Sequence, residues 1–407
     1  PWEAKPRRAL ADDVWELYNV DEDFSETNDL AASNPAKLKE LQALFMKEAE
    51  RYRVLPIDDR LLVRFDPAMA GRPDLMAGRK SLAVFLAAAL LLALFPLVGG
   101  TFYVQLFVKV MILAIFAMSL DLLIGYTGLV SFGHAAYFGL AGYALALLGP
   151  EYEAASLWWS LPAAMAVCAL FALVTGLLVL RTKGIFFIMV TLAFAQMLFF
   201  FFHDSKYGGG SDGIYIYNKP TLSIGGFALA DLEKIEHFYW LVLILMLAVF
   251  LLLRRVLGST FGRALVGIKV NEHRMQALGF PVFRYKLASY VLAGALGGLS
   301  GYLAVVQFGF VNPEILSWHQ SGAVMMMVIL GGMGTLYGPV LGAFAFVLLQ
   351  EAFSNQAWFG DWAKHWQLAM GVFVILVALY LPRGLAGLIA RKAQAVVEEE
   401  EKAEEKP

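Results

Sequence analysis

Residues 157–180 read LWWSLPAAMAVCALFALVTGLLVL, a stretch without a single charged side chain. A helix needs about 20 apolar residues to cross the hydrocarbon core of a bilayer, so this stretch is long enough to span a membrane. A soluble protein could bury one or two such helices, but not seven. We therefore predict an all-α, polytopic helical membrane protein. Six further runs are as long or nearly so: 82–98, 104–124, 184–202, 239–253, 287–308 and 368–381.

The charged residues divide the chain into three parts. Residues 1–80 hold 29 charged side chains and are expected to form a small soluble α/β fragment, whereas residues 81–390 hold only 27 and are expected to form the membrane domain. Residues 391–407 end in a charge run that is typical of a solvated, disordered tail. The net charge of −2 gives no reason to expect nucleic-acid binding, and the single cysteine, Cys168, excludes a disulfide framework and a cysteine metal site.

Within the N-terminal fragment, two elements can be predicted. Residues 14–20 alternate like a strand. The pair Asn34-Pro35 resembles a helix start, with Asn as the cap and Pro at the first helical position. Leucines and aromatic residues then recur at helical spacing over 37–52.

The basic residues predict the topology, because Lys and Arg near span ends favour the cytoplasm. They gather at 79–80, 181–183, 254–286 and 383–392, whereas the loop 203–237 holds five acidic residues and three lysines. Both termini are then cytoplasmic, provided that 322–351 enters the membrane and returns to the same side. We expect about 8–10 spans, including a helical hairpin or re-entrant pair. The residues that interrupt this pair are Gly331, Gly332, Gly334, Gly338 and Pro339.

A second glycine-rich stretch covers 125–142. Its small residues would let another helix backbone approach closely, and this packing is one interpretation. The other is a broken helix that lines a substrate path, with His134 as an ionisable residue within the membrane. The candidate path residues are Gly128, Ser131, Gly133, His134, Tyr137 and Gly139.

The inner loop over 261–280 is predicted to form one short amphipathic helix that ends at Gly279, before Pro281. Such a helix could lie on anionic lipid or dock onto a partner. The sequence contains no Gly-x-x-x-x-Gly-Lys-Ser/Thr stretch, so we expect no ATP hydrolysis by this chain, no catalytic residues and no cofactor of its own.

Five motifs stand out in the sequence: DLLIGYTGLVSFGHAAYFGLAGY (121–143), KGIFFIMVTLAFAQMLFF (183–200), GGSDGI (209–214), GRALVGIKVNEHRMQALGFPVFRYKLASYVLAGALGGLSGYL (262–303) and LGGMGTLYGPVLGAF (330–344). In this order they resemble the LivM-like permease subunits of branched-chain amino acid ABC importers, which reside in the bacterial inner membrane. The resemblance implies a second, LivH-like permease chain, two cytoplasmic ABC ATPases that bind the ATP, and a periplasmic substrate-binding protein.

The fourth motif matches the segment that couples such permeases to their ATPase. Ala277 and Leu278 are expected to anchor this contact and Glu272 to pair with a basic residue of the ATPase, although His273, Arg274 and Met275 depart from the family pattern. The coupling residues implied are Arg263, Glu272, Ala277, Leu278 and Gly279.

The substrate implied by the resemblance is a branched-chain amino acid, or a related small amino acid. Relatives that carry urea or short amides leave a second possibility open. An ion-coupled secondary transporter is a third, but ion coupling usually needs buried carboxylates, and the spans offer few beyond Asp121 and Glu351.

Residues 12–80 resemble the C-terminal region of bacterial arylsulfatases, through WELYNVDEDFSETNDLA (15–31), NPAKLKELQALF (34–45), EAERYRVLPIDDR (48–60) and RFDPAMAGRPDLMAGR (64–79). The sulfatase signature Cys/Ser-x-Pro-x-Arg is missing from the chain. We therefore expect a fusion remnant without activity.

Overall fold

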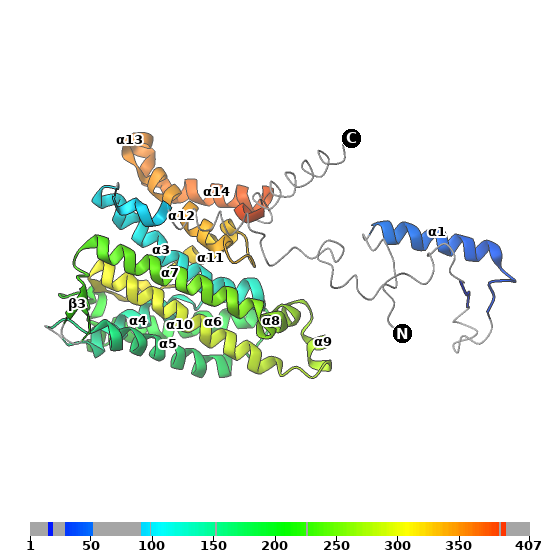
Figure 1. The fold of residues 1–407 in the computed structure, drawn as a ribbon, viewed down its shortest axis with the longest axis horizontal. Helices are drawn as coiled ribbons and strands as arrows, with labels where there is room; N and C mark the ends of the chain where they lie inside the picture. Colours follow the sequence, from blue (N-terminus) through cyan, green and yellow to red (C-terminus); the bar gives the residue numbers. More distant parts are fainter. Residues whose placement is uncertain are drawn as a thin grey trace. The chain divides into compact units, whose positions relative to one another are not determined.

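The structure is a computed structural model that describes residues 15–18, 29–51, 91–97, 99–150, 153–224, 227–381 and 384–387 (Figure 1). The chain divides into two compact units, Pro1–Val84 and Phe85–Pro407.

The first unit contains helix α1, Pro35–Arg51, which begins directly after Asn34. The strand predicted over 14–20 is wrong for residues 15–18, which form neither helix nor strand. The reason lies in the bonds of Leu17: its N–H donates to the Asp29 carboxylate at 2.9 Å, and its carbonyl accepts from Leu30 at 2.7 Å. Bonds to residues 29 and 30 therefore satisfy the Leu17 backbone groups that a sheet would have used. The remainder of the predicted strand lies outside the described residues.

The second unit is a bundle of apolar helices. Among the described residues, five are long and apolar enough to cross a membrane. They are α3 (Thr101–Asp121) with its continuation η4 (Leu122–Thr127), α5 (Leu157–Val179), α6 (Ile185–Asp204), α7 (Ile235–Gly258) and α10 (Val282–Phe308).

Shorter helices complete this unit, so a total of 8–10 spans depends on them and stays a prediction. Of the predicted span 82–98, only 91–97 and the 3-10 turn η3 (Phe95–Leu97) within it are described. The shorter elements are α4 (Ala135–Leu148), η5 (Lys206–Gly208), η6 (Gly210–Asp212), α8 (Thr260–Val270), α9 (Glu272–Ala277), η7 (Pro313–Leu316), α11 (Trp318–Gly331), α12 (Gly338–Ser354), α13 (Gln356–Phe359), η8 (Gly360–His365) and α14 (Trp366–Tyr380).

The α11–α12 pair is interrupted at the predicted glycines. Gly332 and Gly334 have φ angles of 111° and 77°, which only glycine adopts readily, and they reverse the chain between the two helices. A methyl group on Gly331 would overlap the carbonyl oxygen of Gly338, and one on Gly342 would overlap that of Met327. The two helices therefore pack backbone to backbone, as small residues permit in membrane proteins.

Two small antiparallel pairs lie at one end of the bundle, opposite α8 and α9 (Figure 1). Strand β1 (Ile214–Tyr215) pairs with β4 (Phe310–Val311), and β2 (Leu222–Ile224) pairs with β3 (Phe227–Ala230). The loop 203–237, which we call the acidic loop, therefore has a little β structure, whereas the bundle itself is helical.

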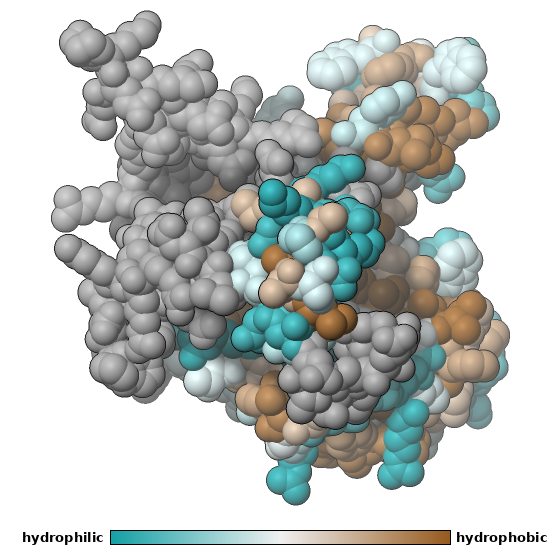
Figure 2. Space-filling view, turned by 90° about the vertical axis from the view of Figure 1, so that its right-hand side faces the viewer, coloured by the Kyte–Doolittle hydropathy of each residue, from teal (hydrophilic) through white to brown (hydrophobic). Residues whose placement is uncertain are grey.

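Helix α3 forms the centre of the bundle. In the most apolar 18 residues of α3 and its continuation η4, 89% of the residues are buried. The corresponding fractions are 33% in α5 and 22% in α6. The outer helices instead expose large apolar side chains, such as Leu170 and Met197. Figure 2 shows hydrophobic residues exposed beside hydrophilic ones on one face of the described residues. This arrangement is expected of helices that face lipid.

Candidate functional site

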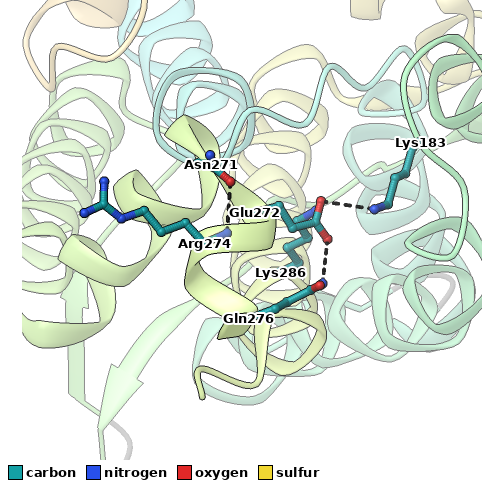
Figure 3. A network of polar contacts seen from close by, with 6 residues as sticks. All are labelled: Lys183, Asn271, Glu272, Arg274, Gln276 and Lys286. Carbon is teal, nitrogen blue, oxygen red and sulfur yellow. Dashed lines mark hydrogen bonds and ion pairs between the residues drawn. The ribbon is translucent and has the colours of Figure 1, made fainter. Parts of the chain in front are cut away.

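The inner loop forms two helices rather than the single helix that the sequence predicted. Helix α8 ends at Val270, and Asn271 has an extended backbone, with φ −156° and ψ 100°. Its side-chain oxygen accepts a hydrogen bond from the Arg274 N–H at 2.9 Å (Figure 3). Asn at this position caps a new helix, because it satisfies a backbone donor that would otherwise lack a partner. The break therefore separates α8 from α9.

Helix α8 is held firmly against the bundle. Its residues Gly262, Ala264, Leu265 and Ile268 are buried. Arg263 lies on the opposite, exposed face. Helix α9 follows closely, since a methyl group on Gly267 would approach the Met275 sulfur to 2.8 Å. The two short helices therefore pack against each other.

Glu272 fixes α9 to the membrane helices. Its carboxylate lies 2.9 Å from the Lys286 ammonium, in the first turns of α10, and 3.5 Å from the Lys183 ammonium, in the turn between α5 and α6 (Figure 3). Gln276 donates to it at 3.5 Å. Burial by itself would raise the pKa of Glu272, but the hydrogen bond and charge of Lys286, together with Lys183, hold the pKa below its ordinary value.

These contacts engage the Glu272 carboxylate within its own chain, with two lysines. The pair with a basic residue of an ATPase stays a prediction. Figure 3 shows the Arg274 side chain pointing away from this cluster.

The residues after α9 form an exposed tip. Ala277, Leu278 and Gly279 are all exposed, and 65% of the Leu278 surface is accessible. Gly279 has φ +83°, and the Phe280 N–H donates to the Met275 carbonyl at 3.1 Å. A glycine in this left-handed conformation ends a helix without strain. The tip therefore presents a small apolar patch at the end of a polar loop.

The predicted path residues lie in closely packed surroundings. Gly128 has φ +77°, where η4 ends, while Ser131 and Gly133 are buried. A methyl group on Gly133 would overlap the Thr191 carbonyl oxygen of α6, and one on Gly139 would overlap the Leu316 side chain. The ring of Tyr137 is buried and meets those of Phe171 and Tyr290 edge-on. This geometry is that of close packing, and a role in a substrate path stays a prediction.

His134 is completely buried and makes one side-chain hydrogen bond. Its Nε2 atom lies 2.8 Å from the Ser119 hydroxyl. That hydroxyl donates to the Phe116 carbonyl at 2.7 Å, so Nε2 is the donor toward Ser119. The other ring nitrogen, Nδ1, is then an acceptor without a partner among the described residues.

Sequence reasoning missed a junction at the end of α3. Asp121 accepts a hydrogen bond from the Gly334 N–H at 2.8 Å, and Lys269 donates to the Gly125 carbonyl at 2.6 Å. Both bonds join positions that are far apart in the sequence. The signals that could have pointed to them are a lone carboxylate in an apolar run and a lone lysine near the end of a short helix.

No metal centre is built by the described residues, because no three of their His, Cys, Asp or Glu side chains gather in one place. One open hollow is lined by Asp361, Trp362, His365 and Leu368, and none of these belongs to the predicted path.

The chain is similar to known transport proteins. The model of the family "branched-chain amino acid transport system / permease component" matches residues 102–380. The chain is 27% identical over 322 residues to the high-affinity branched-chain amino acid transport system permease protein LivM of Escherichia coli, which covers 74% of each chain. It is 28% identical over 173 residues to BraD of Pseudomonas aeruginosa, a permease protein of such a system (41% of this chain, 55% of the relative).

A third relative has a different name. The autoinducer 2 import system permease protein LsrC of Klebsiella pneumoniae is 32% identical over 165 residues, covering 39% of this chain and 45% of the relative. No solved structure matches the chain. The family match and the LivM relatives confirm the resemblance to LivM-like permeases that the five motifs indicated.

Proposed function

Because the chain belongs to the branched-chain amino acid transport system / permease component family, we propose that it is the transmembrane permease subunit of an ABC importer that moves branched-chain amino acids into the cell. The observation that carries this proposal is the extent of the family match, which runs through all five long apolar helices except for the first residue of α3.

The energy for import has to come from a partner. The sequence has no phosphate-binding loop of the Gly-Lys-Ser/Thr type. A permease of this kind therefore receives work from cytoplasmic ABC ATPases, and a second permease chain and a periplasmic substrate-binding protein complete the proposed importer. ATP is bound by the ATPases, and this chain needs no cofactor of its own.

The tip of α9 is the contact we propose for the ATPase. Leu278 and Ala277 supply an exposed apolar patch, while Glu272 ties the same helix to Lys286 and Lys183. A displacement of the tip by the ATPase is thereby transmitted to α10 and to the α5–α6 turn. Glu272 acts as the internal anchor, and Ala277 and Leu278 act as the docking residues.

The family and the relatives also support the substrate. LivM matches over 322 residues, whereas LsrC, named for autoinducer 2 import, matches over 165. A branched-chain amino acid is therefore the substrate class best supported. Urea and short amides are the alternative substrates, and uptake assays with leucine and urea distinguish them from branched-chain amino acids.

We place the chain as a multi-pass protein of the bacterial inner membrane with both termini in the cytoplasm. The basic residues Lys183, Lys269 and Lys286 lie at the end of the bundle that carries α8 and α9, whereas the acidic loop lies at the end with the strands. This separation of charges supports a cytoplasmic position for α8 and α9.

For the N-terminal unit, we propose a sulfatase-like remnant that takes no part in transport. The proposal rests on the resemblance of residues 12–80 and on the missing catalytic signature. Removing residues 1–78 is expected to leave uptake unchanged and the chain inactive toward an aryl sulfate. Loss of uptake on this deletion, with the membrane domain still inserted, would contradict it.

The docking assignment can be tested with matched pairs of variants in the reconstituted importer. Ala277→Asp places a charge in the apolar patch, and Gly279→Val strains a residue with φ +83°. Truncating a buried interface anchor costs about 1 to 4 kcal/mol, so we expect at least a roughly fivefold loss of substrate-stimulated ATP hydrolysis.

The controls lie at the other end of the bundle. Ala357→Asp alters an exposed alanine of α13, and Gly360→Val alters another positive-φ glycine with open space around it. Both controls should keep stimulation. If Ala277→Asp and Gly279→Val also keep wild-type uptake and stimulation, α9 is not the docking site.

A further inference from the structure

We propose that Lys269 and Asp121 are positioning residues that join α8 and the α11–α12 turn to one π-helical segment, so that a displacement of α9 reaches the α11–α12 hairpin. This inference rests on the proposed function, because it assumes that α9 receives work from an ATPase.

The segment η4, which Lys269 contacts and Asp121 directly precedes, has an unusual backbone. After Asp121, the helix changes from α to π geometry over η4, Leu122–Thr127, and ends at Gly128 in the left-handed conformation. Short π segments are rare and occur frequently at functional sites. This one lies at the end of α3, the most deeply buried long helix of the described residues. A change at η4 therefore acts directly on the centre of the bundle.

Lys269 attaches α8 to this segment. Its ammonium donates to the Gly125 carbonyl at 2.6 Å, a short, charge-assisted hydrogen bond. Its alkyl chain lies over Gly128, where a methyl group would come within 3.1 Å of the Lys269 Cγ atom. Since α9 packs on α8 through Met275 and Gly267, the lysine connects the proposed docking helix to η4.

Asp121 attaches the α11–α12 turn to the same segment. Its side chain is only 2% exposed, and its Oδ1 atom accepts a hydrogen bond from the Gly334 N–H at 2.8 Å. A methyl group on Gly125 would overlap Asp121 Oδ1 and would come within 2.7 Å of the Gly334 Cα atom. The turn is therefore seated directly on η4, at a place where only a residue without a side chain fits.

A third contact completes the junction. The hydroxyl of Thr127 lies 2.9 Å from that of Ser289 in α10. Residues 121–127, which are Asp121 and η4, thus bond to α8, to α10 and to the α11–α12 turn. Helix α10 is also the helix whose Lys286 holds Glu272. Two routes therefore lead from α9 to η4, and the bond of Asp121 leads on to the hairpin turn.

The test measures coupling, which is the amount of ATP hydrolysed per substrate molecule imported, rather than transport activity alone. In the complete importer reconstituted in proteoliposomes, Lys269→Met keeps a long apolar side chain but removes the donor. We expect the ATP hydrolysed per molecule imported to rise by roughly tenfold, within the range by which residues between two sites alter coupling. Lys269→Arg, which keeps a cationic donor, should restore most of the wild-type ratio. A wild-type ratio in Lys269→Met would overturn the proposal.

Asp121 supplies an independent variant should Lys269→Met fail to fold. Asp121→Asn keeps an oxygen that can accept from Gly334, whereas Asp121→Leu has none. We expect Asp121→Asn to couple normally and Asp121→Leu to be uncoupled. Equal ratios in the two Asp121 variants would contradict the proposal.

A distance measurement separates this junction from general destabilisation. Spin labels on His273→Cys of α9 and Met333→Cys of the hairpin turn occupy exposed positions, and the native Cys168 is buried. When nucleotide is added to the complete importer, both labels should shift relative to a third label on α6. In Lys269→Met, the α9 label should shift as in the wild type and the hairpin label should shift less. An undiminished shift of the hairpin label would show that the Lys269 bond does not transmit the movement.

The result can be distinguished from failure of the docking assignment. If Ala277→Asp abolishes stimulation while Lys269→Met changes nothing, α9 couples the importer but the η4 junction does not. If Ala277→Asp is also without effect, the docking assignment itself is wrong.

Discussion

Glu272 carries a charge that is balanced within its own chain. Its two lysines come from α10 and from the turn after α5, and the Lys286 side chain is only 13% exposed. Removing the carboxylate would leave a largely buried ammonium without its partner, which costs more than the pair itself contributes. Glu272 is therefore expected to stabilise the position of α9.

Glu272→Gln tests this role directly. We expect the amide protons of α9 to exchange faster, because the free energy of opening of this helix should fall by an amount on the order of 1 kcal/mol. The reason is that hydrogen bonds to charged groups contribute more than neutral ones. Hydrogen exchange followed by mass spectrometry measures this. Glu236→Gln, an exposed glutamate in the first turn of α7, is the matched control. Unchanged protection of α9 would show that the ion pairs are incidental.

The same contact has a defined dependence on pH. Because the pKa of Glu272 in the folded chain is lowered from 4.5, the stabilisation is fully present above that value and is lost as the pH falls through the lower, folded pKa. Glu272 therefore gives α9 no sensitivity to pH in the neutral range.

Among the elements, the α11–α12 hairpin depends on closely packed glycines. Its two helices approach so closely that a methyl group on Gly331 would meet the Gly338 backbone. Gly322, in the same helix, has no atom near the position of an added methyl group. These two glycines therefore separate the effect of packing from that of helix propensity.

Gly331→Ala should destabilise the chain and Gly322→Ala should not. Overpacking costs about 1 to 3 kcal/mol, whereas alanine in place of an open helical glycine is neutral or favourable. Thermal unfolding in detergent, followed through the fraction that remains monodisperse, compares the two. Equal stability of the two variants would mean that the helices do not pack in this way.

The sequence predicts the helices of this bundle better than it predicts their contacts. The runs 157–180 and 184–202 correspond to α5 and α6 within two residues, because the length of an apolar run is a local signal. The break at Asn271 was missed, since the apolar spacing continues across it and only the cap interrupts the helix.

The interior position of α3 could not be predicted either. Helices α3 and α5 are both apolar on all sides, yet one is central and the other faces outward. The candidate site could be predicted only in part. Gly279 was predicted from the sequence, because a glycine followed by proline is a local stop signal. The bond between Lys269 and Gly125 joins residues 144 positions apart, which no local pattern encodes.

For the whole molecule, the orientation in the membrane decides whether the proposed contacts can exist. We expect a cysteine at Ala277 to react with a membrane-impermeant maleimide only from the cytoplasmic side, and one at Ser211, in the acidic loop, only from the other side. Both positions are exposed, and the native Cys168 is fully buried and should stay unlabelled. Labelling of Ala277→Cys in intact cells would reverse the topology and remove α9 from the reach of an ATPase.

What the complete importer carries, and what drives it, are the central claims about the whole molecule. Uptake of radiolabelled leucine into proteoliposomes that contain this chain, its partner permease, the ATPases and the binding protein is the most direct measurement. We predict accumulation that requires both ATP inside and binding protein outside, and that is reduced by excess isoleucine or valine but not by urea. Uptake driven by an ion gradient without ATP, or uptake of urea in place of leucine, would contradict the account.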